Sequence, residues 1–241
     1  MHCLLNQGDF SMRITAGSTK IFFLVLLLML PVPAQAIPAI TCHCFTDRSY
    51  AAARPAAADA YFLATTQNSF FAIVFNTDKK GLVMKKQQGT SADDLWIAYW
   101  VASKSGSAPD TLLQAKSKKE TWKNVIAPLR LTPNVLGVKL SNAIQAHAPD
   151  AQLSEAVVDE VFSRYRLMGE HDLAAMRKSG ATNQELILAT VIAARTRQPA
   201  NQLYLEVKTG ARTWGAILTR AGIDTRNMQQ EVSGILNLRP M

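Results

Sequence analysis

The chain contains two stretches in which almost every residue is apolar, about ninety positions apart. The first runs from Leu95 to Ala102 and the second from Leu186 to Ala194, and Thr190 is their only fully polar side chain, Tyr99 being amphipathic. A helix at the surface would carry polar residues along its exposed face. We therefore predict that both stretches form buried helices, each at the centre of its own part of the fold.

The signals that surround these stretches also occur twice. Gly89 and Gly180 each precede residues that favour the start of a helix, and the dipeptides Thr121-Trp122 and Thr213-Trp214 each begin a later one. At an offset of 91 residues, four of the eighteen positions across 89–106 are identical. The order of the signals predicts an imperfect internal duplication, with a period too long for one solenoid repeat.

The whole pattern predicts an all-α protein, built from two related multi-helix units packed as a helical bundle. The units are expected over 56–148 and 149–241, after a flexible segment over 37–55. Taken alone, Phe70 to Phe75 also fits a short buried strand. Its alignment with a clear helical pattern 91 residues later favours a helix. The remaining helices are expected over 56–75, 80–87, 133–147, 170–178 and 225–237.

The first 36 residues resemble an export signal rather than part of the fold. Arg13 and Lys20 are followed by ten apolar residues from Ile21 to Leu30, and Ala34-Gln35-Ala36 provides a small-x-small cleavage pattern. Ten apolar residues are too few to cross a bilayer, although an uncleaved anchor is the alternative. We expect cleavage after Ala36, with Met12 as a possible true start. The mature chain would be periplasmic in a Gram-negative source and otherwise secreted.

The charge balance limits the expected partners. The formal net charge is +8 for the whole chain, and removal of the export signal leaves a mature chain that is still basic and has no predicted transmembrane segment. A basic surface favours anionic partners, here an anionic envelope component, and a protein partner is the other possibility. Export makes nucleic acid an unexpected partner. The alternative is a solvated surface whose charge only maintains solubility.

Cys42-His43-Cys44 is the one unusual local cluster. A disulfide between Cys42 and Cys44 suits an oxidising compartment, although it closes a small ring. The same three residues could bind copper or zinc as a metal site, since thiolates and imidazole are soft ligands. A disulfide between two chains and lipidation of Cys42 are further alternatives. No cofactor is otherwise expected. His147 and His171, the remaining mature histidines, are more simply a helix-terminal and an exposed residue.

The other candidate groups favour structure over catalysis. Glu155 and Asp159 lie four residues apart on one helix face, and Glu160 is placed to pair with Arg164. Nothing in the sequence supplies the apolar pocket that would drive two carboxylate pKa values apart. The four tryptophans could line a binding groove, but an all-apolar helix favours a core role for Trp96 and Trp100. Nucleotide-binding, hydrolase and zinc-protease motifs are absent from the sequence, so an enzyme is not expected.

The second Thr-Trp element carries a resemblance. Thr213-Trp214-Gly215-Ala216-Ile217, ending at Gly222, resembles a pattern in uncharacterised exported helical proteins of bacteria, in which Trp-Gly-x-Ile opens a short helix. The copy at 94–131 is degenerate, with Arg130 where Gly222 would fall. The resemblance implies an exported helical protein and no particular activity. We therefore expect a non-catalytic binding or structural module of the cell envelope. The alternative is a metal-handling or thiol-redox protein that uses Cys42, His43 and Cys44.

Overall fold

The computed structural model describes residues 45–118 and 121–236, and within these ranges the ordered elements are all helices. This confirms the predicted all-α fold. All of the described residues belong to one compact unit, Ile40–Met241. The export signal and the cluster Cys42-His43-Cys44 lie outside the described residues. None of the helices in the described ranges is long and apolar enough to cross a membrane.

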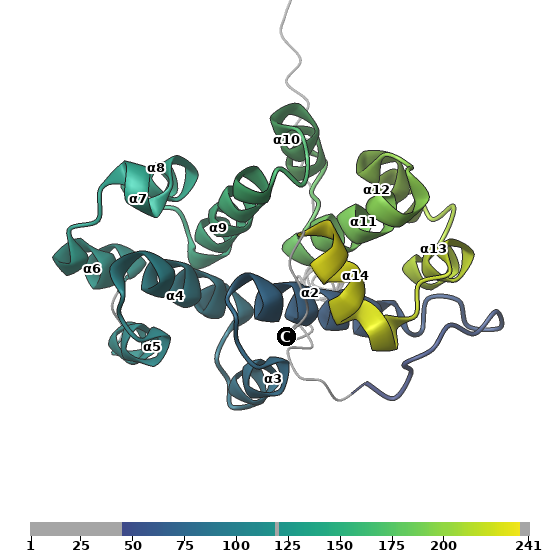
Figure 1. Cartoon of the computed structure of the whole chain (residues 1–241), viewed down its shortest axis with the longest axis horizontal. Helices are drawn as coiled ribbons and strands as arrows, with labels where there is room; N and C mark the ends of the chain where they lie inside the picture. Colours follow the sequence, from purple (N-terminus) through teal and green to yellow (C-terminus); the bar gives the residue numbers. More distant parts are fainter. Residues whose placement is uncertain (1–44, 119–120, 237–241) are drawn as a thin grey trace, which may run out of the picture. The chain divides into compact units, whose positions relative to one another are not determined.

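The helices form two series along the chain (Figure 1). The first series is α2 (Asp59–Val74), α3 (Lys79–Gln87), α4 (Ala92–Ser105), α5 (Pro109–Ser117), α6 (Trp122–Ile126), η1 (Ala127–Leu129), α7 (Pro133–Leu136) and α8 (Val138–Gln145). The second is α9 (Asp150–Tyr165), α10 (Glu170–Lys178), α11 (Asn183–Thr196), α12 (Ala200–Lys208), α13 (Trp214–Ala221), η2 (Thr225–Asn227) and α14 (Met228–Ile235).

The bounds of the helices recur along the chain. Helices α2, α3, α4 and α5 reappear as α9, α10, α11 and α12, each with the same length and each beginning 91 residues later. The last helix of the first series, α8, reappears as α14 after 90 residues. The predicted spacing of 91 residues therefore also describes the arrangement of the helices. Descent from a duplicated segment stays a prediction.

The helix starts follow the side chains that the sequence marks. Ser91 accepts a hydrogen bond from the backbone N–H of Asp94 at the start of α4, and Thr182 forms a capping box with Glu185 at the start of α11. Thr121 and Thr213 accept from backbone N–H groups in the same way at the starts of α6 and α13. These contacts satisfy donors that the first turn of a helix leaves free.

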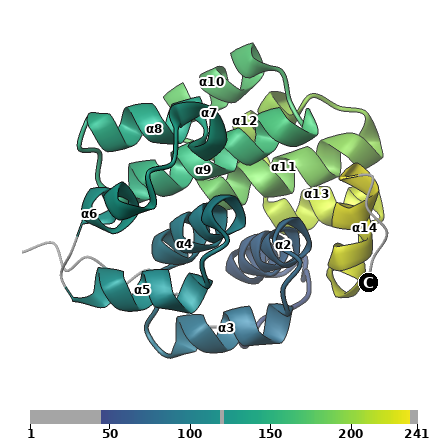
Figure 2. The ribbon, with the colours of Figure 1, turned by 60° about the vertical axis from the view of Figure 1, so that its left-hand side comes forward.

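The two series are packed into each other. The first helix of each series packs against the other series, because α2 lies on α11 and α14 while α9 lies on α4 and α8. Figure 2 shows the two predicted central helices, α4 and α11, among these neighbours. A single cluster of buried apolar side chains runs through both series. The rings of Phe70, Trp96 and Phe162, from α2, α4 and α9, meet within it.

The tryptophans are part of this core. Trp96, Trp100, Trp122 and Trp214 are at most 4% exposed, so they do not line an open groove. Two of the indoles keep a hydrogen-bond partner in the interior. Trp100 Nε1 donates to the Leu136 carbonyl at 2.6 Å, and Trp122 Nε1 donates to Asp94 Oδ1 at 2.9 Å. Burial of such a large ring is favourable only if its N–H remains bonded.

The predicted continuous helix over 133–147 is wrong. It is divided into α7 and α8 at Gly137, whose φ of 105° is unfavourable for residues with a side chain. A Cβ at Gly137 would also lie 2.5 Å from Cδ of Glu160. That glutamate accepts a hydrogen bond from the backbone N–H of Lys139 at 2.6 Å, at the start of α8. Glu160 therefore stabilises a helix start, a role that the expected pairing with Arg164 did not include.

Candidate functional site

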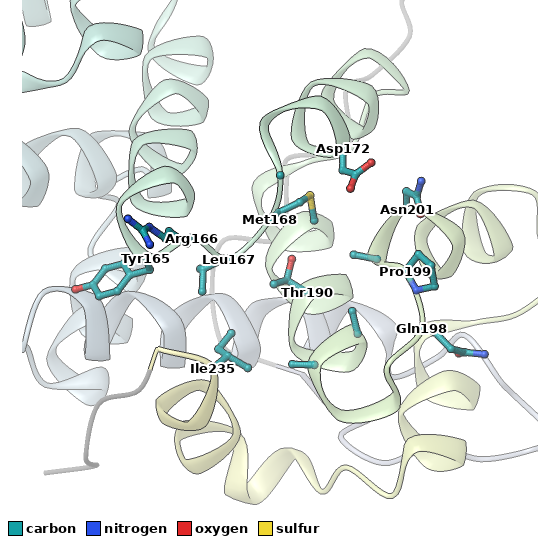
Figure 3. Close-up of a pocket in the computed structure, with 14 residues that line it drawn as sticks. Tyr165, Arg166, Leu167, Met168, Asp172, Thr190, Gln198, Pro199, Asn201 and Ile235 are labelled. Carbon is teal, nitrogen blue, oxygen red and sulfur yellow. The ribbon is translucent and has the colours of Figure 1, made fainter.

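A pocket of about 560 Å³ opens in the second series of helices, between the loop that follows α9, the middle of α11 and the start of α12 (Figure 3). Its volume falls within the usual range for small-molecule sites. Leu167, Met168 and Ile235 give it apolar walls, and Thr190 of α11 contributes the polar group nearest its centre (Figure 3). Thr190 is only 6% exposed, and its hydroxyl donates to the Leu186 carbonyl at 2.7 Å.

In the described part of the first series, aromatic rings pack together at the corresponding place. The positions that match Thr190 and Arg166, 91 residues earlier, are Tyr99 and Phe75. The Tyr99 ring lies 5.8 Å from the Phe75 ring and 5.0 Å from the Phe71 ring, measured between centroids. In the second series a threonine replaces the tyrosine. Arg166 is exposed, so its side chain does not fill the space. The two series therefore differ at this place in the size and direction of the side chains at two matching positions.

Polar groups gather at the rim of the pocket. Asp172 of α10, Gln198 of the loop before α12 and Asn201 of α12 line it (Figure 3), together with Gly169 and Pro199. The last two residues are the N-caps of α10 and α12, and neither helix start receives a side-chain hydrogen bond at its cap. The rim can thus offer a carboxylate, two amides and backbone donors to a ligand whose apolar part occupies the interior.

A second hollow, of about 710 Å³, lies between the segment Arg48–Tyr50, the start of α2 and the α13–α14 region. Its two arginines are already engaged. Arg226 pairs with Asp224 at 2.6 Å, and Arg48 donates to the Phe45 carbonyl at 3.0 Å. We regard the pocket at Thr190 as the better candidate, since its origin can be traced to specific residue differences between the two series.

A pair of polar links also recurs at the 91-residue spacing. Lys86 of α3 donates to Asn68 Oδ1 of α2 at 2.6 Å, and Arg177 of α10 donates to Asp159 Oδ1 of α9 at 2.8 Å. Each residue of the second link lies 91 positions after its counterpart in the first. In both series the link fastens a short amphipathic helix to the long helix before it. The sequence pattern did not predict either link.

The first of these links is part of a larger polar group in the interior. Burial lowers the pKa of Lys86 to about 8, and the Asp93 carboxylate opposes part of this shift. Asp93 in turn accepts a hydrogen bond from Ser154 at 2.5 Å, and Asn183 donates to the Ser154 hydroxyl at 3.1 Å. These contacts join α3, α4, α9 and α11. The bonds satisfy polar groups that would otherwise be costly to bury.

Two of the carboxylates singled out by the sequence, Asp159 and Glu160, have structural partners. Asp159 is held by Arg177; burial raises the pKa of Asp159, and the guanidinium opposes that rise. The Asp159 carboxylate is thus neutralised by an ion pair, and this arrangement does not suit a role in proton transfer. His147 Nε2 lies 3.3 Å from Lys123 Nζ, and the side chain of His171 is 97% exposed.

The predicted metal or disulfide residues Cys42, His43 and Cys44 lie outside the described residues, so that hypothesis stays a prediction. Within the described ranges, no three side chains of the metal-binding types come together. Comparisons with protein-family models, curated proteins and solved structures found no match to this chain.

Proposed function

We propose that this protein is an exported, non-catalytic binding protein that holds a small ligand in the pocket at Thr190. The observation that carries the proposal is the difference between the two series. One series fills this space with Tyr99 and Phe75, whereas the other leaves about 560 Å³ open. The hollow is open to solvent on one side and has the size of a small-molecule site, so its presence at one of two matching places favours a ligand.

The rim and the interior suggest the kind of ligand. Apolar walls with two amides, a carboxylate and backbone donors at the mouth suit a small molecule that is apolar at one end and carries hydrogen-bonding groups at the other. We further propose that the two helical series descend from one duplicated segment, with the second copy specialised for binding. The recurring helix bounds and the matching links of Lys86 and Arg177 support this origin.

The substitution Thr190→Tyr tests the proposal, because it places in the second series the ring that fills the first. A fragment library screened by ligand-observed NMR should give compounds that bind the native protein and lose at least about tenfold in affinity in Thr190→Tyr, a loss of about 1.4 kcal/mol. Thr190→Val keeps the size of the side chain and should retain most of the binding. Circular dichroism checks that both variants remain folded.

Two results would contradict the proposal. One is a set of binders that is unchanged by Thr190→Tyr, and the other is the absence of any binder in the library. The metal-handling alternative has a separate signature, namely stoichiometric copper or zinc in the purified mature protein that is lost in Cys42→Ser. Under our proposal we expect neither metal.

A further inference from the structure

The segment between α5 and α9 concentrates positive charge. Residues 111–149 contain six lysines and arginines but only one acidic residue, in a chain whose totals are 26 and 18. Among the described residues of this segment, Lys116 and Lys118 lie at the end of α5, and Lys123 lies in α6. This segment therefore carries a net charge of +5, out of a formal net charge of +8 for the whole chain.

The fold brings these charges to one place. Lys123 Nζ lies 3.3 Å from His147 Nε2, and Lys116 Nζ lies 2.8 Å from Asp150 Oδ2. His147 lies in the short connection between α8 and α9, and Asp150 is the first residue of α9, so the two lysines contact neighbouring parts of the chain. We call Lys116, Lys118, Lys123 and His147 the basic end.

The basic end has little compensating charge. Asp150 is its one ion-pair partner among the described residues, and both Lys118 and Lys123 are exposed. The corresponding region of the second series is different. Arg212 lies 2.8 Å from Glu206, and Arg226 lies 2.6 Å from Asp224, so those arginines are paired within their own series. Exposed cations such as Lys118 and Lys123 extend their field into solvent and attract anions.

Exposed apolar side chains lie in the same stretch of the chain, between Lys123 and His147. Val135 of α7 and Val138 of α8 are 46% and 55% exposed. Asn142 and Gln145 continue the exposed side of α8 from Val138 toward His147, at helical spacings of four and three residues. Helix α8 also packs against α6, which carries Lys123. This region therefore combines the cations of α5 and α6 with the exposed branched side chains of α7 and α8.

We propose that the basic end, together with Val135 and Val138, docks this protein onto an anionic phospholipid bilayer. Anionic headgroups attract exposed lysines over roughly one Debye length, and exposed apolar side chains can enter the interface beneath them. Single-stranded nucleic acid is a poorer fit, because its binding surfaces usually offer aromatic rings for stacking. The aromatic ring of this region, Trp122, is only 1% exposed. The proposal is independent of the pocket at Thr190.

Vesicle co-sedimentation tests the proposal with residues 37–241, which contain every described helix. The native protein should bind vesicles of phosphatidylcholine with 30% phosphatidylglycerol, and it should bind pure phosphatidylcholine at least about tenfold less well. The double variant Lys118→Gln/Lys123→Gln should lose roughly 30-fold in partition coefficient, since each basic residue contributes about 1 kcal/mol. High salt should weaken the native binding.

The matched control is Arg212→Gln/Arg220→Gln, which removes the same charge from residues near Glu206 in the second series. It should retain most of the binding. An equal loss in both double variants would overturn the proposal, because net charge alone would then explain the attraction. Absence of vesicle binding would also overturn it, as would binding to single-stranded DNA in place of vesicles. Circular dichroism of each variant confirms that the helices persist.

Discussion

Lys86 carries a positive charge into the interior of the helical unit. Its ammonium donates to Asn68 and lies near Asp93, yet these partners do not replace all of its lost hydration. Burial consequently lowers its pKa to about 8 from an ordinary value of 10.5. The sequence shows only a lysine near the end of a short amphipathic helix, a position that is typically solvated. The shift results from α2 and α4 packing around the side chain.

We predict that this shift makes stability depend on alkaline pH. Between about pH 8 and 10.5 the unfolded chain holds a proton on Lys86 that the folded chain has released. The free energy of unfolding should therefore rise with pH across this window, by on the order of 3 kcal/mol from this residue. Urea unfolding at pH 7.5, 9 and 10.5 measures the rise, and Lys86→Gln should remove that share of it.

The control for this prediction is Lys80→Gln, in the same helix but with an exposed side chain. It should leave the pH dependence as it is in the native protein. Burial also lowers the pKa of Lys79, which donates to Thr65 and Ser69, so part of the rise should persist in Lys86→Gln. A pH profile that is identical in the native protein and Lys86→Gln would contradict the prediction.

At the scale of helices, the start of α13 depends on a residue from the far end of the chain. Asp59, the first residue of α2, accepts hydrogen bonds from the backbone N–H groups of Trp214 at 3.0 Å and Gly215 at 2.8 Å. A carboxylate at this position satisfies free donors and complements the partial positive charge of the helix start. The contact also explains Gly215, where a Cβ would lie 2.9 Å from the Tyr50 ring.

We predict that Asp59→Ala destabilises the fold by about 1–3 kcal/mol, because it leaves two partly buried donors without a partner. Asp150 is the matched control, since it occupies the same place at the start of α9. There the carboxylate pairs with Lys116 in a partly exposed contact at 2.8 Å. Asp150→Ala should therefore cost less than about 1 kcal/mol. Chemical denaturation of both variants gives the comparison, and equal losses would contradict it.

The sequence predicts those features of the fold that depend on local signals, such as the starts of helices. Thr121, Thr213 and Thr182 mark helix starts because capping requires particular side chains at particular positions. The interruption at Gly137 was missed, since an isolated glycine in a helical pattern is often tolerated. One feature of the sequence is connected with the pocket, namely the polar residue Thr190 in a helix that is otherwise apolar. Its significance depends on the Tyr99 ring at the matching place, and that requires the packing of the first series.

At the scale of the whole unit, the pairing of helices could not be predicted because apolar faces do not identify their partners. Two apolar units of similar length could pack side by side or exchange elements, with the same periodicity in either case. The structure has the exchanged arrangement, in which α2 packs on α11 and α14 while α9 packs on α4 and α8. Each series thus completes its core with the first helix of the other. If the two series descend from one segment, that segment before duplication would have needed a second copy of itself to cover the same apolar faces.

This arrangement makes a prediction about the halves 37–148 and 149–241. Produced together from separate genes, they should co-purify and give the circular dichroism of the intact chain, because α2 and α9 still find their partners. Produced alone, each half should lose cooperative unfolding and expose apolar surface to a fluorescent dye, since α4 and α8 in one half, and α11 and α14 in the other, lack their cover. Division after Gln88, which separates α2 and α3 from the rest, provides a second pair of fragments that tests the same idea.

Independent cooperative folding of either isolated half as a monomer would show that the exchanged helices are dispensable. A half that instead folds only as a homodimer would agree with the exchange, because two copies can supply each other with the missing first helix.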